Sequence, residues 1–234
     1  MSQFVLGRAK AQMVKAMEEY YNAIQVNVQF SGSHLKVITV TSVQPGEGKS
    51  TTSTNLAISF ANSGYRTLLI DADIRNSVMT GTFKAEEAYH GLTSYLSGHV
   101  DLNSVIHETS VSNLSLIPAG QVPPNPTTLL QNTRFDAMIE QFRRQYDYVI
   151  IDTPPIGLVV DAAIVAQKTD GSILVTESGA ISRRFVKKAV EQMEQSGAQF
   201  LGVILNKVDT TKERYGSYGS YGAYGNYGKQ PDTD

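Results

Sequence analysis

One stretch, residues 36–52, constrains the fold of this chain more than any other. It reads KVITVTSVQPGEGKSTT, a short β-branched apolar run followed by glycines, a lysine and hydroxyl residues. The eight residues from Val43 to Ser50 match the Walker A pattern G-x-x-x-x-G-K-[ST] except at its first glycine, where Val43 stands. The pattern predicts a buried strand, a phosphate-binding loop and the first turn of a helix, in that order.

This loop predicts a site for a nucleoside triphosphate with Mg²⁺. Gly46 and Gly48 allow backbone N–H groups to turn toward phosphate oxygens, and the helix beginning at Lys49 directs its positive end to the same anion. Lys49 is expected to reach the β- and γ-phosphates, and the Ser50 hydroxyl to bind Mg²⁺. A glycine turn with a chance lysine is the alternative, which the strand, loop and helix order disfavours. The expected nucleotide-binding residues of the loop are Pro45, Gly46, Glu47, Gly48, Lys49, Ser50 and Thr51.

Three aspartates follow apolar runs that read as buried strands, and phosphoryl transfer needs such carboxylates to hold a metal and orient a nucleophile. Asp152 ends YVIID and is placed as a Walker B aspartate, although an aspartate there is also a common helix cap. Asp71 and Asp73 end LLIDAD, and we expect them to face opposite sides, one toward the metal and one toward an incoming hydroxyl. Asp73 as a simple cap is the alternative. Arg75 is expected to steady phosphate charge or to pair with Asp73.

A fourth polar motif, N-K-x-D, follows the last apolar run at residues 206–209. Asn206 at a strand end is suited to contact the base of either ATP or GTP. The motif is short, and the role of Asp209 stays open.

Apolar runs alternate with helical patterns along the chain, which predicts an α/β fold: a P-loop NTPase with a doubly wound, mostly parallel sheet flanked by helices. Such sheets bind ligands beyond the carboxyl ends of their strands, where the motifs above lie. The expected strands are 37–40, 66–71, 113–117, 148–152, 171–176 and 200–205. The expected helices are 8–30, 49–62, 91–96, 127–144, 161–167 and 181–196.

The C-terminal segment has a different composition. Tyrosines recur there at a period of three, each followed by glycine, at Tyr215, Tyr218, Tyr221, Tyr224 and Tyr227. No aliphatic residue is available for burial, so we expect a disordered, flexible tail. The expected organisation is an N-terminal helical segment (1–33), a P-loop domain (34–210) and this tail (211–234).

Composition excludes several classes of function. There is no cysteine, so disulfides and thiolate chemistry are excluded, and the four histidines show no metal-ligand spacing. The net charge is −2 and no basic stripe carries interleaved aromatics, so no nucleic-acid partner is expected. We also expect no signal peptide and no membrane-spanning helix.

Together the segments SVQPGEGKST, LLIDADIR and VIIDTPP resemble the Walker A, A′ and B motifs of bacterial tyrosine kinases. The tail resembles their C-terminal tyrosine cluster, and EEYYNAIQVNVQFSG and PNPTTLLQN are similar to autokinases of streptococcal capsule and exopolysaccharide clusters. The resemblance implies an ATP-dependent tyrosine autokinase with Lys49, Asp71, Asp73 and Asp152 as catalytic residues. It implies Ser50, Asp71 and Asp152 as Mg²⁺ ligands and the five tail tyrosines as phosphoacceptors.

The same resemblance implies partners and a location. A transmembrane adaptor of the polysaccharide export system supplies a cytosolic tail that activates the kinase, and a cognate protein-tyrosine phosphatase resets the tyrosines. The chain is then cytoplasmic and recruited to the inner face of the membrane. Family members often carry E-x-x-R-x-x-R for ring assembly, whereas Glu19, Asn22 and Gln25 stand here, so a homo-oligomer needs other contacts.

Two other functions stay open from the sequence. In the first, the chain would be a partition-type ATPase switch; in the second, it would be a scaffold in which the nucleotide is structural. Gln44, where partition ATPases usually have lysine, favours the kinase over the switch. A tail that is merely solubilising or sticky is the alternative to a phosphoacceptor tail.

Overall fold

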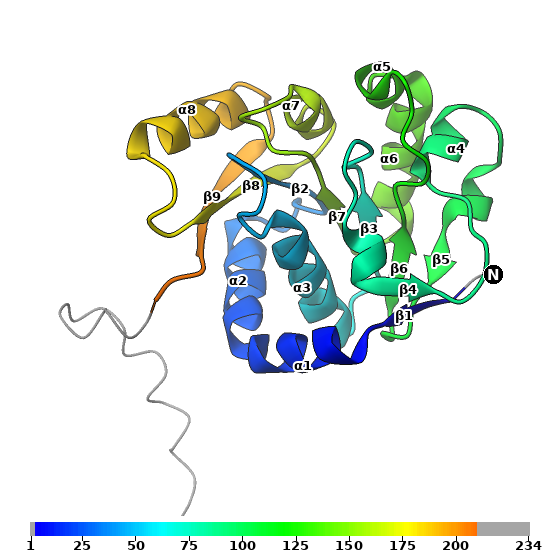
Figure 1. Ribbon diagram of the computed structural model, residues 1–234, viewed down its shortest axis with the longest axis horizontal. Coiled ribbons are helices and arrows are strands. Elements are labelled where there is room, and N and C mark those ends of the chain that lie inside the picture. Colours follow the sequence, from blue (N-terminus) through cyan, green and yellow to red (C-terminus); the bar gives the residue numbers. More distant parts are fainter. Residues whose placement is uncertain (1–2, 210–234) are drawn as a thin grey trace, which may run out of the picture.

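The computed structural model describes residues 3–209 and contains the predicted mostly parallel sheet (Figure 1). The order across the sheet is β5-β6-β3-β7-β2-β8-β9, and every pairing is parallel except β5 with β6. The antiparallel edge strand β5 was not expected. The strands are β2 (Val37–Ser42), β3 (Thr67–Asp71), β5 (His107–Glu108), β6 (Leu114–Ile117), β7 (Tyr148–Asp152), β8 (Gly171–Glu177) and β9 (Gln199–Asn206).

Helices cover both faces of this sheet because each central strand is apolar on both sides. In β7, Val149 and Ile151 pack toward α4, α5 and α6, whereas Ile150 packs toward α2 and α3. Leu174 of β8 packs against α7 and α8. The helices are α1 (Arg8–Ala16), α2 (Glu18–Ser31), α3 (Lys49–Asn62), α4 (Leu92–Leu96), α5 (Pro126–Leu130), α6 (Thr133–Gln145), α7 (Asp161–Ala166) and α8 (Arg183–Glu194).

Two helices predicted as continuous are each broken. The helix expected at 8–30 becomes α1 and α2 because Met17, with φ −105 and ψ 4, leaves the helical conformation between them. The helix expected at 127–144 becomes α5 and α6. There the Asn132 side chain accepts a hydrogen bond from the Arg134 N–H at 3.0 Å, which caps a new helix start. The apolar spacing continues across both breaks, so periodicity alone did not show them.

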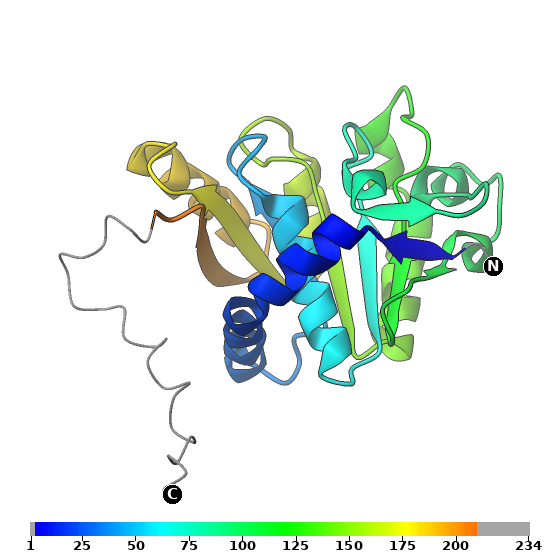
Figure 2. The same cartoon turned by 60° about the horizontal axis from the view of Figure 1, so that its bottom comes forward.

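The N-terminal segment packs on the domain rather than standing apart from it. Tyr21 and Val28 of α2 are buried in the core beside α3, and β1 (Phe4–Leu6) pairs antiparallel with β4 (Phe83–Ala85). Figure 2 shows α1 crossing in front of α3 and β1 alongside β4. The boundary at residue 33 remains a prediction.

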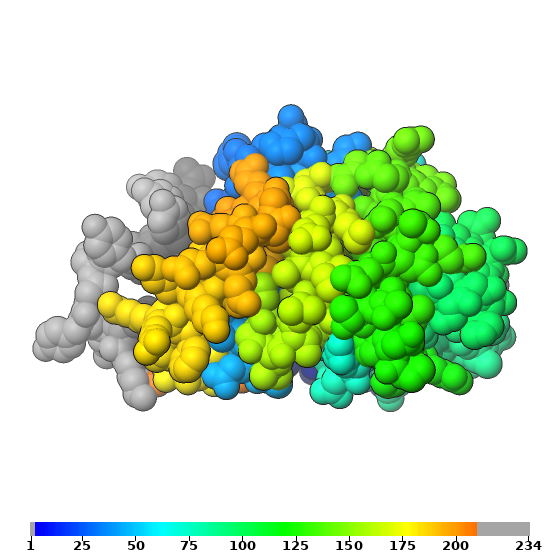
Figure 3. Space-filling view, turned by 90° about the horizontal axis from the view of Figure 1, so that it is seen from above, coloured from blue at the N-terminus to red at the C-terminus, as the bar shows by residue number. Residues whose placement is uncertain are grey.

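In Figure 1, α2 and α3 lie below the sheet, whereas α8, α7 and the α5–α6 pair lie above it. Seen from above, α8, α7 and the α5–α6 pair lie side by side from left to right over this face of the sheet (Figure 3). Within the described residues, no helix has the length and apolar character needed to cross a membrane. The five tail tyrosines lie outside the described residues.

Candidate active site

The phosphate loop joins β2 to α3 as predicted, and α3 begins at Lys49. Gly46 and Gly48 adopt φ values of 84 and 95, a left-handed conformation that side chains with a Cβ disfavour. Gly48 also has no room for a side chain, because a Cβ there would lie 2.0 Å from the Asn206 Nδ2 atom. The two glycines therefore shape the loop by backbone conformation and by close packing.

Two of the predicted aspartates meet because their strands are neighbours. Asp71 ends β3 and Asp152 ends β7, and the two residues are direct partners in the parallel register. Side-chain alternation places both on the face covered by α3, together with Leu69 and Ile150. Ser53 of α3 donates a hydrogen bond to Asp152 Oδ1 at 3.0 Å. The phosphate loop and both carboxylates thus share one face of the sheet.

Lys49 lies at the centre of this cluster. Its Nζ atom is 2.7 Å from Asp73 Oδ2, 3.6 Å from Asp152 Oδ2 and 3.1 Å from the Ser50 hydroxyl. The expectation that Asp71 and Asp73 face opposite sides is wrong, because both carboxylates act on Lys49. Residues two apart in extended chain share a face, so this outcome follows from backbone geometry. Asp73 also accepts from the Asn76 N–H at 3.1 Å, so it caps the following turn as well.

Burial controls the ionisation of the aspartates. Burial first, and the nearby charge of Asp152 second, raise the pKa of Asp71 to about 8, although Ser77 donates a hydrogen bond to it. Burial likewise raises the pKa of Asp152 above its ordinary value, against the opposing effect of Lys49. Burial lowers the pKa of Lys49, but the charges of Asp152 and Asp73 outweigh it, so its pKa lies above the ordinary value. Lys49 therefore remains charged.

A cavity of about 360 Å³ opens above Lys49 and is large enough for a ligand. Of the predicted loop residues, Pro45, Gly46, Gly48, Lys49, Ser50 and Thr51 line it. Asp73 lines it too, whereas Asp71 and Asp152 are buried beneath. Its other lining residues are Arg75, Asn76, Val78, Pro154, Pro155, Leu158 and Val159.

The residues present fit a Mg²⁺–nucleotide. Among residues 3–209, no group of three or more histidine, cysteine or acidic side chains is arranged to hold a metal alone. Mg²⁺ does not require one, since it commonly takes one or two carboxylates, water and phosphate oxygens. The negative charge of Asp152 raises the pKa of the neighbouring Asp71, which is the electrostatic condition that a divalent cation relieves. Ser50, Asp71 and Asp152 are the residues suited to hold it.

Glu47 is a buried carboxylate inside the anion-binding loop, and its side chain does not line the cavity. It accepts hydrogen bonds from Gln44 N at 2.6 Å, Thr176 Oγ1 at 2.9 Å and Glu177 N at 3.1 Å. We call these four residues the Glu47 clasp. They tie the phosphate loop to the end of β8. At Glu47 only the backbone is therefore free to face phosphate. The motif alone did not reveal that the Glu47 side chain holds the loop to β8.

The base-reading motif also holds the loop. Asn206 Nδ2 donates to the Glu47 carbonyl at 2.9 Å. Lys207, with a left-handed φ of 55, donates from Nζ to the Gly46 carbonyl at 2.8 Å and pairs with Glu177. Asn206 does not line the cavity, and its contact with a base stays a prediction.

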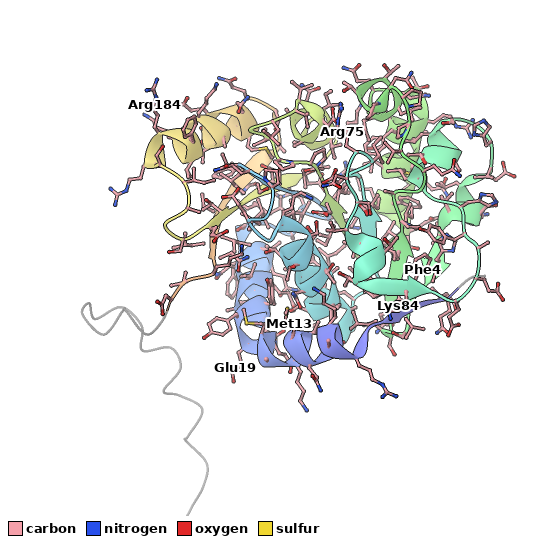
Figure 4. All side chains as sticks on the ribbon, in the orientation of Figure 1. Phe4, Met13, Glu19, Arg75, Lys84 and Arg184 are labelled. Carbon is pink, nitrogen blue, oxygen red and sulfur yellow. The ribbon has the colours of Figure 1, made fainter. Side chains whose placement is uncertain are left out.

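Arg75 does not pair with Asp73. Its Nε atom lies 2.6 Å from Asp161 Oδ2, and its Nη2 atom donates to Thr127 Oγ1 at 2.9 Å. Thr127 in turn donates to Asp161 Oδ1 at 2.8 Å, so the buried carboxylate has two partners. Figure 4 shows Arg75 at the upper edge of the molecule beside α7. Asp161 and Thr127 were missed because no local pattern links residues so far apart in the chain.

Comparisons with known proteins agree with this geometry. A family model described as the AAA domain matches residues 35–199. Tyrosine-protein kinase CpsD of Streptococcus agalactiae serotype III is 60% identical over 208 residues, which cover 89% of this chain and 90% of that protein. CpsD of Streptococcus pneumoniae serotype 4 is 55% identical over 90% of this chain and 93% of its own length.

Solved structures give the same picture. The kinase domain of Escherichia coli tyrosine kinase ETK is similar with a TM-score of 0.80 and 34% identity, covering 86% of this chain and 80% of that one. The septum site-determining protein MinD of Pyrococcus horikoshii, complexed with Mg-ADP, is similar with a TM-score of 0.63 and 24% identity, covering 73% of this chain and 70% of that one. The second likeness concerns the fold alone.

Proposed function

This chain belongs to the bacterial tyrosine-protein kinases, and from that membership we propose that it transfers the γ-phosphoryl group of ATP to tyrosines of its own C-terminal segment. The proposed acceptors are Tyr215, Tyr218, Tyr221, Tyr224 and Tyr227. The observation that carries the proposal is the meeting of the phosphate-loop lysine with Asp73, which lines the cavity, and with Asp152, which is buried beneath it. Lys49 Nζ lies 2.7 Å from Asp73 and 3.6 Å from Asp152.

In the proposed mechanism, the loop and the buried aspartates bind and orient the nucleotide. Lys49 exchanges its contact with Asp73 for the β- and γ-phosphates, which frees the Asp73 carboxylate. Ser50, Asp71 and Asp152 hold Mg²⁺, which when bound neutralises charge on the β- and γ-phosphates. Asn206 contacts the base from the end of β9.

Asp73 is the proposed base, since its carboxylate lines the cavity whereas that of Asp71 is fully buried. The acceptor tyrosine oxygen forms a bond to the γ-phosphorus, and the bond from that phosphorus to the bridging oxygen breaks. ADP leaves with the bridging oxygen, and the tyrosine hydroxyl proton passes to Asp73. The products are ADP and O-phosphotyrosine.

The biological setting proposed here rests on the family resemblance. The kinase regulates synthesis and export of a capsular or extracellular polysaccharide, and it works at the inner face of the membrane with a transmembrane adaptor. A protein-tyrosine phosphatase removes the phosphates. Each phosphate adds about −1.5 to −2 charges to the tail, so phosphorylation is expected to loosen any homo-oligomer by repulsion. An oligomer whose size is the same before and after phosphorylation would contradict that last step.

Intact mass spectrometry tests the kinase activity. The full chain is incubated with Mg-ATP, with and without the cytosolic tail of the adaptor, and Lys49→Met is the control. The expected result is mass steps of single phosphates that map to the tail tyrosines and disappear in the control. Hydrolysis of ATP without any mass change under both conditions would refute the kinase and favour the partition-type switch.

A further inference from the structure

The cavity above Lys49 has a charged side and an apolar side. Lys49, Ser50 and Asp73 form the first, and the second comes from the turns that follow β3 and β7. On the apolar side Val78 and Leu158 are 54% and 63% exposed. Exposed apolar side chains that line the cavity holding the phosphate loop require an explanation, since nothing within the described chain covers them.

These two side chains are presented by ordered turns. Val78 lies between Ser77, whose hydroxyl donates to Asp71, and Met79, which is buried. Leu158 lies in a turn in which its own N–H donates to the Pro155 carbonyl at 3.1 Å. The Ser77 side chain thus ties the first turn to the end of β3, and the second turn is joined to β2 by the Ile156 N–H, which donates to the Ser42 carbonyl at 2.8 Å. The apolar surface therefore keeps a set place relative to Lys49.

We propose that Val78 and Leu158 form the subsite for the phenol ring of the acceptor tyrosine, and that its occupant is the Tyr-Gly repeat at residues 215–228. This inference rests on the proposed function and deepens it. An acceptor oxygen must come within about 3–3.5 Å of the γ-phosphorus before transfer, so the acceptor side chain has to enter this cavity. A tyrosine ring needs apolar surface around it and a polar end for its hydroxyl, which the two sides of the cavity supply.

The sequence of the repeat suits this subsite. Residues 215–228 carry no charged side chain, so they bring no unpaired charge to an apolar surface. Glycine follows every tyrosine, which lets the backbone approach the turns closely. The described chain also ends near the cavity: Lys207 donates to the carbonyl of Gly46, a lining residue, and two residues separate Lys207 from the 25 residues 210–234.

The subsite also accounts for a preference for tyrosine over serine. A serine side chain is too short to cover Val78 and Leu158 while its hydroxyl reaches the phosphate. Both valine and leucine then stay hydrated, and the gain from their burial is lost. We therefore assign these residues to acceptor specificity, distinct from the loop residues that bind nucleotide.

The test uses the full chain, Mg-ATP, the adaptor tail and an added peptide with the sequence of residues 213–228. Steady-state phosphorylation of the peptide is compared between the wild type, the double variant Val78→Ser/Leu158→Ser, and Leu158→Phe. Val122→Ser is the matched control, because Val122 is 68% exposed and does not line the cavity. Thermal unfolding verifies that each variant is folded.

The double variant is expected to raise the KM for the peptide by roughly tenfold, which corresponds to about 1.4 kcal/mol, and by far more than the KM for ATP. Leu158→Phe is expected to keep or lower the KM for the peptide, and the control to change neither constant. An unchanged KM for the peptide in the folded double variant would overturn the subsite while leaving the kinase intact. If the wild type phosphorylates no tyrosine, the proposed function itself fails, and the inference with it.

Discussion

Replacing Glu47 separates two physical effects of opposite sign at the phosphate loop. The carboxylate is a negative charge within a loop that binds phosphate, so its removal alone strengthens anion binding, on the order of 1 kcal/mol in a partly solvated site. The same carboxylate accepts one hydrogen bond from within the loop, at 2.6 Å, and two from β8, at 2.9 and 3.1 Å, which hold the loop to that strand. Its removal therefore also disorders the loop. The sign of the change in nucleotide affinity therefore shows which effect is larger.

We expect the loss of hydrogen bonds to dominate. In Glu47→Gln the amide oxygen still accepts from Thr176 and Glu177, but the amide NH₂ faces the N–H of Gln44, another donor. One hydrogen bond to a charged group is lost, a cost of about 1.5–3 kcal/mol. If nucleotide binding must reorder the loop against that cost, affinity falls by roughly 10- to 100-fold. Glu47→Ala loses all three bonds, and its free energy of unfolding should fall by about 2–4 kcal/mol.

Calorimetric titration with a Mg²⁺–nucleotide and urea unfolding of the nucleotide-free chain measure both quantities. Glu140→Gln is the control, since Glu140 forms an ion pair with Arg143 at 3.2 Å on the surface of α6. Such exposed pairs contribute about 0–1 kcal/mol, so the control should leave nucleotide affinity unchanged. Equal or tighter nucleotide binding by Glu47→Gln would show that charge outweighs the Glu47 clasp, and the reasoning would fail.

Three further predictions concern neighbouring residues. Burial and the adjacent β7 aspartate raise the pKa of Asp71 from 3.8 to about 8, so the folded state favours the protonated carboxyl. The stability of the nucleotide-free chain should therefore fall as the pH rises between these two pKa values. In thermal unfolding measured from pH 5 to 8, Asp71→Asn should make this fall smaller than in the wild type. Equal dependence of the unfolding temperature on pH in the two proteins would contradict this. Arg75→Ala should lower the free energy of unfolding in urea by at least about 1 kcal/mol more than Asp161→Ala does. Arg75→Ala leaves the buried Asp161 carboxylate without its ion-pair partner, whereas in Asp161→Ala the partly exposed Arg75 guanidinium can be hydrated. The reverse order would refute that argument. Gly48→Ala should weaken nucleotide binding more than about tenfold. Gly64→Ala, with a similar φ of 89 and open space around its Cβ, should affect stability alone, and equal binding losses would mean that the clash is irrelevant.

Much of the site was predictable because its parts are local. A β-branched run, two glycines, a lysine and a serine define a strand, a loop and a helix start within a few residues of one another. Aspartates after apolar runs mark the carboxyl ends of strands, and parallel strands place those ends at one edge. The roles of Lys49, Ser50, Asp71, Asp73 and Asp152 as site residues were inferred in this way and stay predictions until they are tested by mutation.

Other features depend on partners that local sequence does not specify. Arg75 pairs with Asp161, 86 positions away, and not with the nearby Asp73. The Glu47 side chain points away from the phosphate site and accepts a hydrogen bond from Thr176 of β8. The break at Met17 interrupts no apolar spacing.

The sequence by itself determined the parallel strands of the sheet, most of the helical segments and the place of the phosphate loop, because backbone preference and side-chain period act over short distances. The tertiary structure alone decided which strands are neighbours, and so which carboxylates lie next to one another. The physical reason is that charge and burial depend on distance in space, which the order β3-β7-β2 sets and the chain sequence does not display.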